Sequence, residues 1–152
     1  MTRSLQSSLY GELEYNDQDV YHFEDGVPGF PHLREFLLIT VEESPFTVMH
    51  AINEDTSFFL INPFTRYEGY EVQIPNAAKK QLKIENLEDV ALYSIVVLRE
   101  PLEDSTANLA APVILNTKGK LGAQVSLDAP QFSIRTPLFE NIPQVSVGKE
   151  GK

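Results

Sequence analysis

The chain has 152 residues and carries 12 Lys and Arg against 22 Asp and Glu, a formal net charge of −10. Its length predicts one domain with its own hydrophobic core, and its lack of cysteine excludes disulfides, thiol catalysis and Cys-ligated metals. A negative surface disfavours direct nucleic-acid binding. No apolar run reaches the ~20 residues of a membrane span, and no apolar segment follows Arg3 as in a signal peptide. We therefore expect a soluble, cytoplasmic protein without membrane or nucleic-acid contacts.

Alternating apolar and polar residues predict β-strands through the first half of the chain. The expected strands, in chain order, are residues 9–15, 20–23, 37–41, 46–52, 58–61 and 70–74. A polar turn at residues 16–19 separates the first two strands, and Asn62-Pro63 ends the fifth. The loop at residues 26–31 is rich in Gly and Pro, and we expect it to place Val27 and Phe30 against the core. A phosphate-binding role for this loop is disfavoured, because no helix follows it.

One short helix is predicted after Pro75. Asn76 is a suitable N-cap, and residues 77–83 are mostly strong helix formers that would give about two to three turns. The apolar run at residues 90–98 then indicates a central strand that is covered on both faces. A final strand pair is expected at residues 113–115 and 123–127.

This pattern predicts a mainly all-β fold, a small antiparallel β-barrel-like domain with one short helix. Closing the barrel would leave few exposed strand edges. We expect one domain over residues 1–139 and a flexible C-terminal tail at residues 140–152, where small and charged residues gather.

No catalytic or metal-binding motif is visible. His22, His32 and His50 lack the spacing of metal ligands, so structural or surface roles are expected for them. The adjacent acidic pairs lie at predicted turns, which favours solvated turn residues over general acid–base pairs. No G-x-S-x-G nucleophile elbow is present. We therefore expect no cofactor and no metal.

Four residue blocks stand out in the sequence: residues 98–127, FEDGVPGF at residues 23–30, Ser44-Pro45-Phe46 and Pro63-Phe64. In their residues, order and spacing they resemble the flagellar assembly factor FliW family, and the resemblance spans Leu9 to Phe139. It implies an interaction protein rather than an enzyme. Proteins of this family bind flagellin in the cytoplasm and capture the RNA-binding regulator CsrA, which relieves repression of flagellin mRNA translation. The same roles, in a monomer, are expected here.

Two groups of residues are candidates for partner binding. Phe64, Arg66 and Tyr67 lie in a segment crowded with aromatic residues, and we expect Phe64 or Tyr67 to be partly exposed. Asp104, Ser105, Thr106 and Asn108 form a polar connection that can cap its own backbone and still face a partner. We expect Asn108 to stabilise the fold more than it contributes to binding.

Two alternatives remain open from the sequence. The acidic surface can serve solubility alone, or it can speed the association of a basic partner. The domain can also be a small β-barrel enzyme or ligand carrier of unknown substrate. A deep polar pocket with converging histidines and carboxylates would favour the enzyme, whereas a shallow apolar groove would favour a binding protein.

Overall fold

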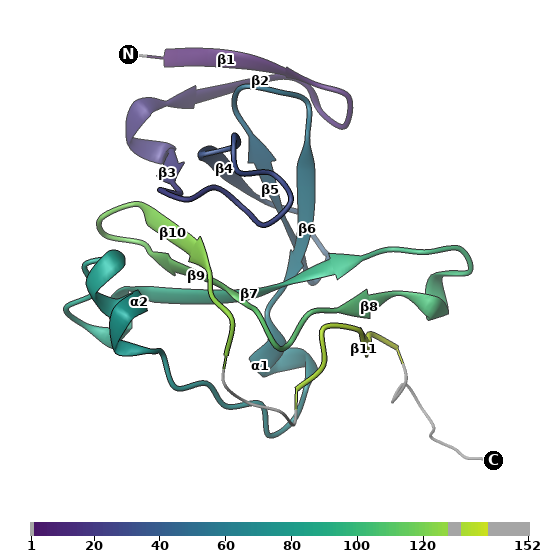
Figure 1. Cartoon of the computed structure of the whole chain (residues 1–152). Coiled ribbons are helices and arrows are strands. Elements are labelled where there is room, and N and C mark those ends of the chain that lie inside the picture. The colour runs from purple at the N-terminus through teal and green to yellow at the C-terminus, as the bar shows by residue number, and fades with distance from the viewer. Residues whose placement is uncertain (1, 128–131, 140–152) are drawn as a thin grey trace.

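The computed structural model describes residues 2–127 and 132–139, so the expected tail at residues 140–152 lies outside the described residues. Seven strands close a barrel in the order β7-β6-β5-β4-β3-β10-β9, and β9 pairs back to β7 (Figure 1). The barrel strands are β3 (Tyr21–His22), β4 (Glu35–Thr40), β5 (Phe46–Ala51), β6 (Ser57–Ile61), β7 (Val90–Val97), β9 (Val113–Asn116) and β10 (Leu121–Gln124). Neighbouring barrel strands are antiparallel except for the parallel pair β3–β10. The predicted β-barrel is confirmed.

A separate hairpin of β1 (Thr2–Ser7) and β2 (Gly11–Asn16) lies at one end of the barrel (Figure 1). The predicted first strand at residues 9–15 was therefore wrong at its start, and the strand before it was missed. The chain turns between the two strands because the Ser7 hydroxyl accepts hydrogen bonds from the backbone N–H groups of Leu9 and Tyr10. Gly11 then has a positive φ of 73°, which favours glycine.

The middle of the sheet is apolar on both faces. In β9, Val113 and Leu115 belong to the barrel core with Phe23, Phe36 and Met49. Ile114, between them in sequence, points to a second core that also contains Leu82, Leu92 and Leu109. Residues of β7 likewise contact both cores. The prediction that this apolar run is a strand covered on both faces is confirmed.

The described ranges contain two short α-helices rather than the single predicted one: α1 (Pro63–Arg66) and α2 (Asn76–Gln81). Asn62 and Pro63 end β6 and also begin α1, since the Asn62 side chain accepts a hydrogen bond from the Phe64 N–H. Asn76 is the first helical residue, not the N-cap, which is Pro75. Three 3-10 turns add to these helices, at Asp17–Asp19, Leu87–Asp89 and Leu102–Asp104. Neither α-helix approaches the length or apolarity that crossing a membrane requires, and no other described helix does.

Residues 70–74 were predicted to be a strand, and they are not. Their alternation is correct as a burial pattern: Tyr70, Val72 and Ile74 pack against the second core, whereas Glu71 and Gln73 are exposed. The segment pairs with no other strand, so its backbone runs as an extended cover before Pro75. Period-two patterning reports which side chains are buried and does not report which strand they pair with.

The loop at residues 26–31 has the expected packing role. The Val27 and Phe30 backbones form an isolated antiparallel bridge, and both side chains pack in or against the barrel core. Gly26 and Gly29 have positive φ values of 68° and 87°. The loop is therefore a tight structural turn that fills one end of the barrel.

Candidate functional site

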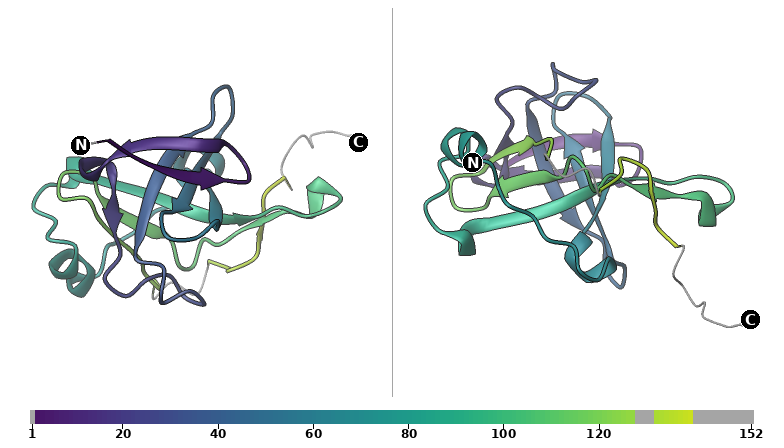
Figure 2. Two further views of the ribbon diagram at one scale, coloured as in Figure 1. Left: turned by 90° about the horizontal axis from the view of Figure 1, so that it is seen from above. Right: turned by 60° about the horizontal axis from the view of Figure 1, so that its bottom comes forward.

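A projecting arm is the main departure from the compact barrel. Beyond their paired residues, β7 and β8 (Thr106–Ala107) are joined by residues 98–105, which extend away from the barrel on the side opposite α2 (Figure 2). The buried Ser105 hydroxyl closes the base of this arm by accepting a hydrogen bond from the Arg99 N–H at 3.0 Å. The arm exposes the apolar side chains of Leu98 and Leu102 beside three acidic residues, Glu100, Glu103 and Asp104.

An open groove of about 390 Å³ lies at the base of the arm. Its lining includes the exposed side chains of Val97 and Ile134, which are 47% and 60% accessible to solvent. Two candidates from the sequence, Thr106 and Asn108, also line it. The remaining lining residues are Val27, Pro28, Phe58, Ile95, Arg99, Gln124 and Arg135. This is the shallow, largely apolar surface that favours a binding protein.

The other candidate residues surround α1, at the lower end of the barrel in Figure 1. Phe64 is 48% exposed, and its ring centroid lies 5.4 Å from that of Tyr70. The expectation that Phe64 or Tyr67 would be partly exposed is confirmed. Arg66 and Tyr67 lie on the side of α1 that faces β11 (Thr136–Pro137).

Contacts of residues 137–138 join the two candidate groups. Arg66 donates a hydrogen bond to the Leu138 carbonyl, and the Tyr67 hydroxyl donates to the Pro137 carbonyl at 2.9 Å. The Leu138 N–H in turn donates to the Ser105 carbonyl at 2.9 Å. Arg66, Tyr67 and Ser105 therefore hold the end of the described chain against the barrel. The candidates whose side chains remain at the surface are Phe64, Asp104 on the arm, and Thr106 and Asn108 in the groove.

The five aromatic residues between Phe58 and Tyr70 do not form one surface cluster. Phe58 packs against the barrel core, while Phe59 packs against a third core on the other face of β6. Tyr70 is buried, and its hydroxyl donates to the Leu109 carbonyl at 2.9 Å. Burial raises the pKa of Tyr70 to about 12, which keeps this hydroxyl protonated as a donor. Phe64 alone among the five has an exposed side chain.

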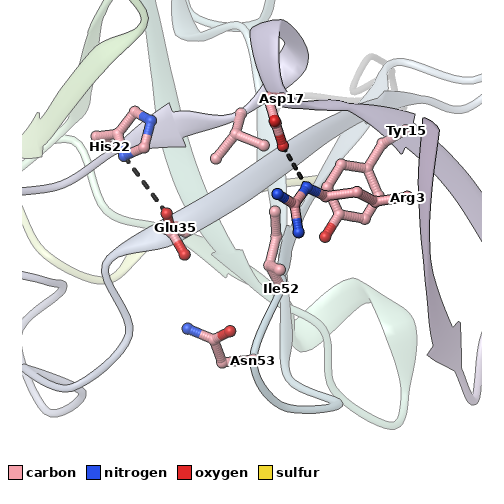
Figure 3. A pocket seen from close by; sticks show the side chains of 8 residues that line it. Arg3, Tyr15, Asp17, His22, Glu35, Ile52 and Asn53 are labelled. Carbon is pink, nitrogen blue, oxygen red and sulfur yellow. Dashed lines mark hydrogen bonds and ion pairs between the residues drawn. The ribbon is translucent and has the colours of Figure 1, made fainter. Parts of the chain in front are cut away.

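A polar pocket of about 340 Å³ lies between the β1–β2 hairpin and the barrel (Figure 3). Arg3 forms an ion pair with Asp17, and His22 Nδ1 lies 3.7 Å from Glu35 Oε2. The side chains of His22 and Glu35 are both largely solvent-exposed. At 3.7 Å the two groups are beyond ordinary hydrogen-bond distance and both are open to solvent, so they do not form an oriented acid–base pair. The pocket gives little support to the enzyme alternative.

A buried histidine links the hairpin to the barrel. His50 is fully buried on β5, with Nδ1 at 2.7 Å from the Ala51 carbonyl and Nε2 at 3.0 Å from the Ser7 hydroxyl. Since a carbonyl only accepts hydrogen bonds, these contacts fit an imidazole whose Nδ1 is protonated and whose Nε2 accepts from Ser7. Asp55 Oδ1 lies 3.5 Å from the same Nε2 atom. In a Ser-His-Asp triad the acid contacts the other ring nitrogen, so this arrangement is structural.

The loop before β6 supplies two carboxylates with hydrogen-bonded oxygens. Asp55 accepts a hydrogen bond from the backbone N–H of Ser8, which lowers the pKa of Asp55. Glu54 accepts from the Thr56 hydroxyl and contacts His32 at 3.1 Å, and both contacts lower the pKa of Glu54. Among residues 2–127 and 132–139, His, Asp and Glu side chains do not gather in a group of three suited to a metal ion. The contacts of Asp55 and Glu54 therefore hold loops in place.

Asn108 carries the first testable prediction. Its side-chain oxygen accepts hydrogen bonds from the backbone N–H groups of Ala110 and Ala111, at 3.1 and 2.9 Å. Asn108→Ala should lower the free energy of unfolding by about 1–3 kcal/mol because both donors lose their acceptor. Urea unfolding measures this loss, and Asn108→Asp, which keeps an acceptor oxygen, is the control. An unchanged midpoint for Asn108→Ala, together with lost partner binding, would instead make this residue part of the interface.

Comparison with known proteins agrees with this architecture. A family model described as FliW protein matches residues 4–138. The chain is 35% identical over 136 residues to the flagellar assembly factor FliW of Geobacillus kaustophilus, covering 89% of this chain and 94% of that protein. It is 34% identical over 139 residues to that of Clostridium botulinum strain Okra, with 90% and 97% covered. A crystal structure of a flagellar assembly factor FliW superposes with a TM-score of 0.84 at 34% identity, covering 90% of this chain and 96% of the other. The chain therefore belongs to the FliW family.

Proposed function

We propose that this protein is a non-enzymatic flagellar assembly factor of the cytoplasm that binds flagellin and sequesters the translational regulator CsrA. Capture of CsrA would free flagellin mRNA for translation. The assembly role is supported by membership of a family whose relatives are named flagellar assembly factors. The two partners are those that the sequence blocks imply, and the surface chemistry must be compatible with both.

The observation that carries the proposal is the pairing of exposed apolar and acidic side chains on the arm. Leu102 is 56% exposed, and Glu103 and Asp104 follow it directly. Exposed apolar residues that project from a compact fold mark sites of protein association. The acidic neighbours and the net charge of −10 favour a basic partner, as an RNA-binding regulator would be.

A non-enzymatic role is supported by the geometry of the polar groups. The His22–Glu35 pair is solvent-exposed, and the Ser7 hydroxyl already accepts two backbone N–H groups while it contacts His50. Neither arrangement combines a free nucleophile with an oriented base. No observation favours the alternative of a small enzyme or ligand carrier, because the pockets described above are open to solvent.

Association kinetics with a CsrA homologue test the proposal. Raising the salt concentration should slow association much more than it speeds dissociation, because screening weakens long-range steering. Glu103→Lys/Asp104→Lys should lower the association rate about tenfold or more and also speed dissociation. Glu12→Lys/Glu14→Lys makes the same charge change at exposed positions of the hairpin and should affect association alone. Surface plasmon resonance separates the two rates.

Gel-shift titration provides the functional measurement. The wild-type protein should weaken the complex between CsrA and flagellin leader RNA without binding the RNA itself. Direct RNA binding at physiological salt, or an intact CsrA–RNA complex at saturating protein, would contradict the proposed function. A rate of association that is independent of salt would limit the role of the acidic surface to solubility.

A further inference from the structure

We propose that the groove at the base of the arm is a second protein-binding site, whose occupant is a segment of another protein with apolar side chains next to a carboxylate. Arg99 and Arg135 would bind the carboxylate, and Val97 and Ile134 would contact the apolar side chains. This site differs in charge from the acidic arm, and it does not depend on which flagellar protein supplies the segment.

Strand geometry places the relevant side chains on one face. Ile95, Val97 and Arg99 alternate along β7 and its continuation, so they point to the same side of the sheet. Thr106 of β8 and Asn108, which follows that strand, alternate in the same way, and β8 pairs with β7 through Val97↔Thr106. The groove therefore has a floor of apolar and small polar groups that begins at the barrel and ends at the arm.

The two arginines stand near opposite ends of this floor. Thr136 pairs with Ala107, which sets Arg135 beside Asn108 at the barrel end of β8. The Arg99 N–H donates a hydrogen bond to the Ser105 hydroxyl, at the end of the groove floor where the arm begins. Along β8 this separation is on the order of 10 Å, a span of about three extended residues. A short peptide segment is therefore long enough to contact both cations and the apolar residues between them.

Within the part of the chain that the structure describes, neither guanidinium has a hydrogen-bond or ion-pair partner. In the described ranges, no Asp or Glu forms an ion pair with Arg99 or Arg135, although the chain has 22 acidic residues and 12 basic ones. Both side chains are exposed. An arginine presents a planar set of donors that matches a carboxylate with two parallel hydrogen bonds. Two unpaired arginines beside an open apolar groove thus form a binding surface for an acidic, apolar segment.

The net charge of the chain makes some ligands of the groove less favourable than others. A nucleic acid brings many phosphates, which the net charge of −10 repels, and two arginines offer little compensation. A second copy of this chain could offer Leu102 with Glu103 and Asp104, but it carries the same net charge and the two copies repel each other. A segment of a different protein that has one acidic residue among apolar ones avoids both the repulsion of many phosphates and the repulsion between two like-charged copies.

The experiment uses the labelled full-length protein on an array of short overlapping peptides. The array spans flagellin and the CsrA homologue, and adds unrelated sequences in which an acidic residue adjoins apolar ones. Each peptide is also printed with its acidic residues changed to Lys. The wild-type protein should bind peptides in which an acidic residue adjoins apolar ones. Its signal on the Lys versions of these peptides should be lower by about tenfold or more.

Charge reversal in the groove gives the matching test on the protein. Arg99→Glu/Arg135→Glu should reduce the signal on the same peptides about tenfold or more. Arg34→Glu/Lys118→Glu, at exposed positions that do not line the groove, changes the net charge equally and should bind these peptides as the wild type does. Both variants should melt within a few degrees of wild type, because the altered side chains are exposed and form no side-chain hydrogen bond or ion pair within the described ranges.

The outcomes are distinguishable. Retention of only the unrelated acidic-apolar peptides would support the groove and count against the proposed partners at this site. Loss of flagellin or CsrA binding in both double variants would indicate a general charge effect and overturn the groove assignment, as would a wild-type protein that retains no acidic-apolar peptide. A wild-type dimer in sedimentation that dissociates in Arg99→Glu/Arg135→Glu would show that the occupant is a second copy, and would overturn the assignment to a different protein.

Discussion

Gly26→Ala is expected to lower the free energy of unfolding by about 3 kcal/mol or more, a large share of the stability of a typical domain. Gly26 has a positive φ of 68°, a conformation that strains any residue with a Cβ atom. A Cβ at this position would also lie 2.7 Å from the Cα and the carbonyl oxygen of Pro31. Those neighbours are backbone atoms, so they cannot rotate away. The two costs add because one is torsional and the other steric.

Gly29→Ala is the matched control in the same loop. Its φ of 87° is also positive, but a Cβ there would meet nothing within 4 Å. Gly29→Ala should therefore lower the free energy of unfolding only by the cost of a positive φ at a residue with a Cβ, about 1–2 kcal/mol. Urea unfolding of both variants measures the difference. Equal losses would mean that Pro31 shifts at little cost and that the loop is less rigid than its contacts indicate.

This loop also shows what the sequence could predict. Two glycines and two prolines in six residues leave few backbone conformations, so the turn and the burial of Val27 and Phe30 could be inferred without coordinates. The β-barrel could be predicted for a similar reason, because alternation and apolar runs mark each strand locally. Closure of the barrel was inferred from the number of short strands and from the exposed edges that an open sheet would leave.

Features that depend on distant contacts were harder to predict. The Thr2–Ser7 strand alternates weakly, and its stability comes from pairing with β2 and from the Ser7–His50 contact across 43 positions of sequence. Helix α1 was missed because Asn62-Pro63 is a stop signal and an N-terminal helix signal at once. The Tyr70–Ile74 segment, which pairs with no strand in the described ranges, could not be distinguished from a strand because its side chains alternate as those of a strand do.

Some features of the candidate site could be predicted from the sequence, and others depend on distant contacts. Exposure of an aromatic residue near Arg66 could be predicted from the density of aromatic residues there, because a small core cannot hold them all. The structural roles of Arg66 and Tyr67 could not, since their acceptors are carbonyls some 70 residues further along the chain. The groove was not predicted because Arg99 and Arg135 are ordinary surface arginines until β8 and β11 bring them to one face.

Phe64→Ala is expected to weaken flagellin binding by about 2 kcal/mol, close to thirtyfold in affinity, if this surface receives flagellin as proposed. Phe64 offers an aromatic side chain that is 48% exposed on a helix held in place by the Asn62 cap and the Arg66 contact. A rigid, half-exposed ring can bury its free face in a partner with little loss of conformational entropy. The flagellin terminal regions implied by the family resemblance would present an apolar stripe of suitable character.

Calorimetric titration with flagellin and with CsrA measures the effect, and thermal melting checks the fold. Removal of the Phe64 ring leaves Tyr70 packed against Phe132, whose ring centroids lie 4.7 Å apart, so the melting temperature should change by only a few degrees. Leu87→Ala is the control, because Leu87 is also an exposed apolar residue but lies in the turn before β7, away from α1. Its flagellin affinity should equal that of wild type, and CsrA binding should be unchanged in both variants. Normal flagellin binding by Phe64→Ala would contradict a role for the Phe64 ring in the proposed interface and would direct the search to the arm and its groove.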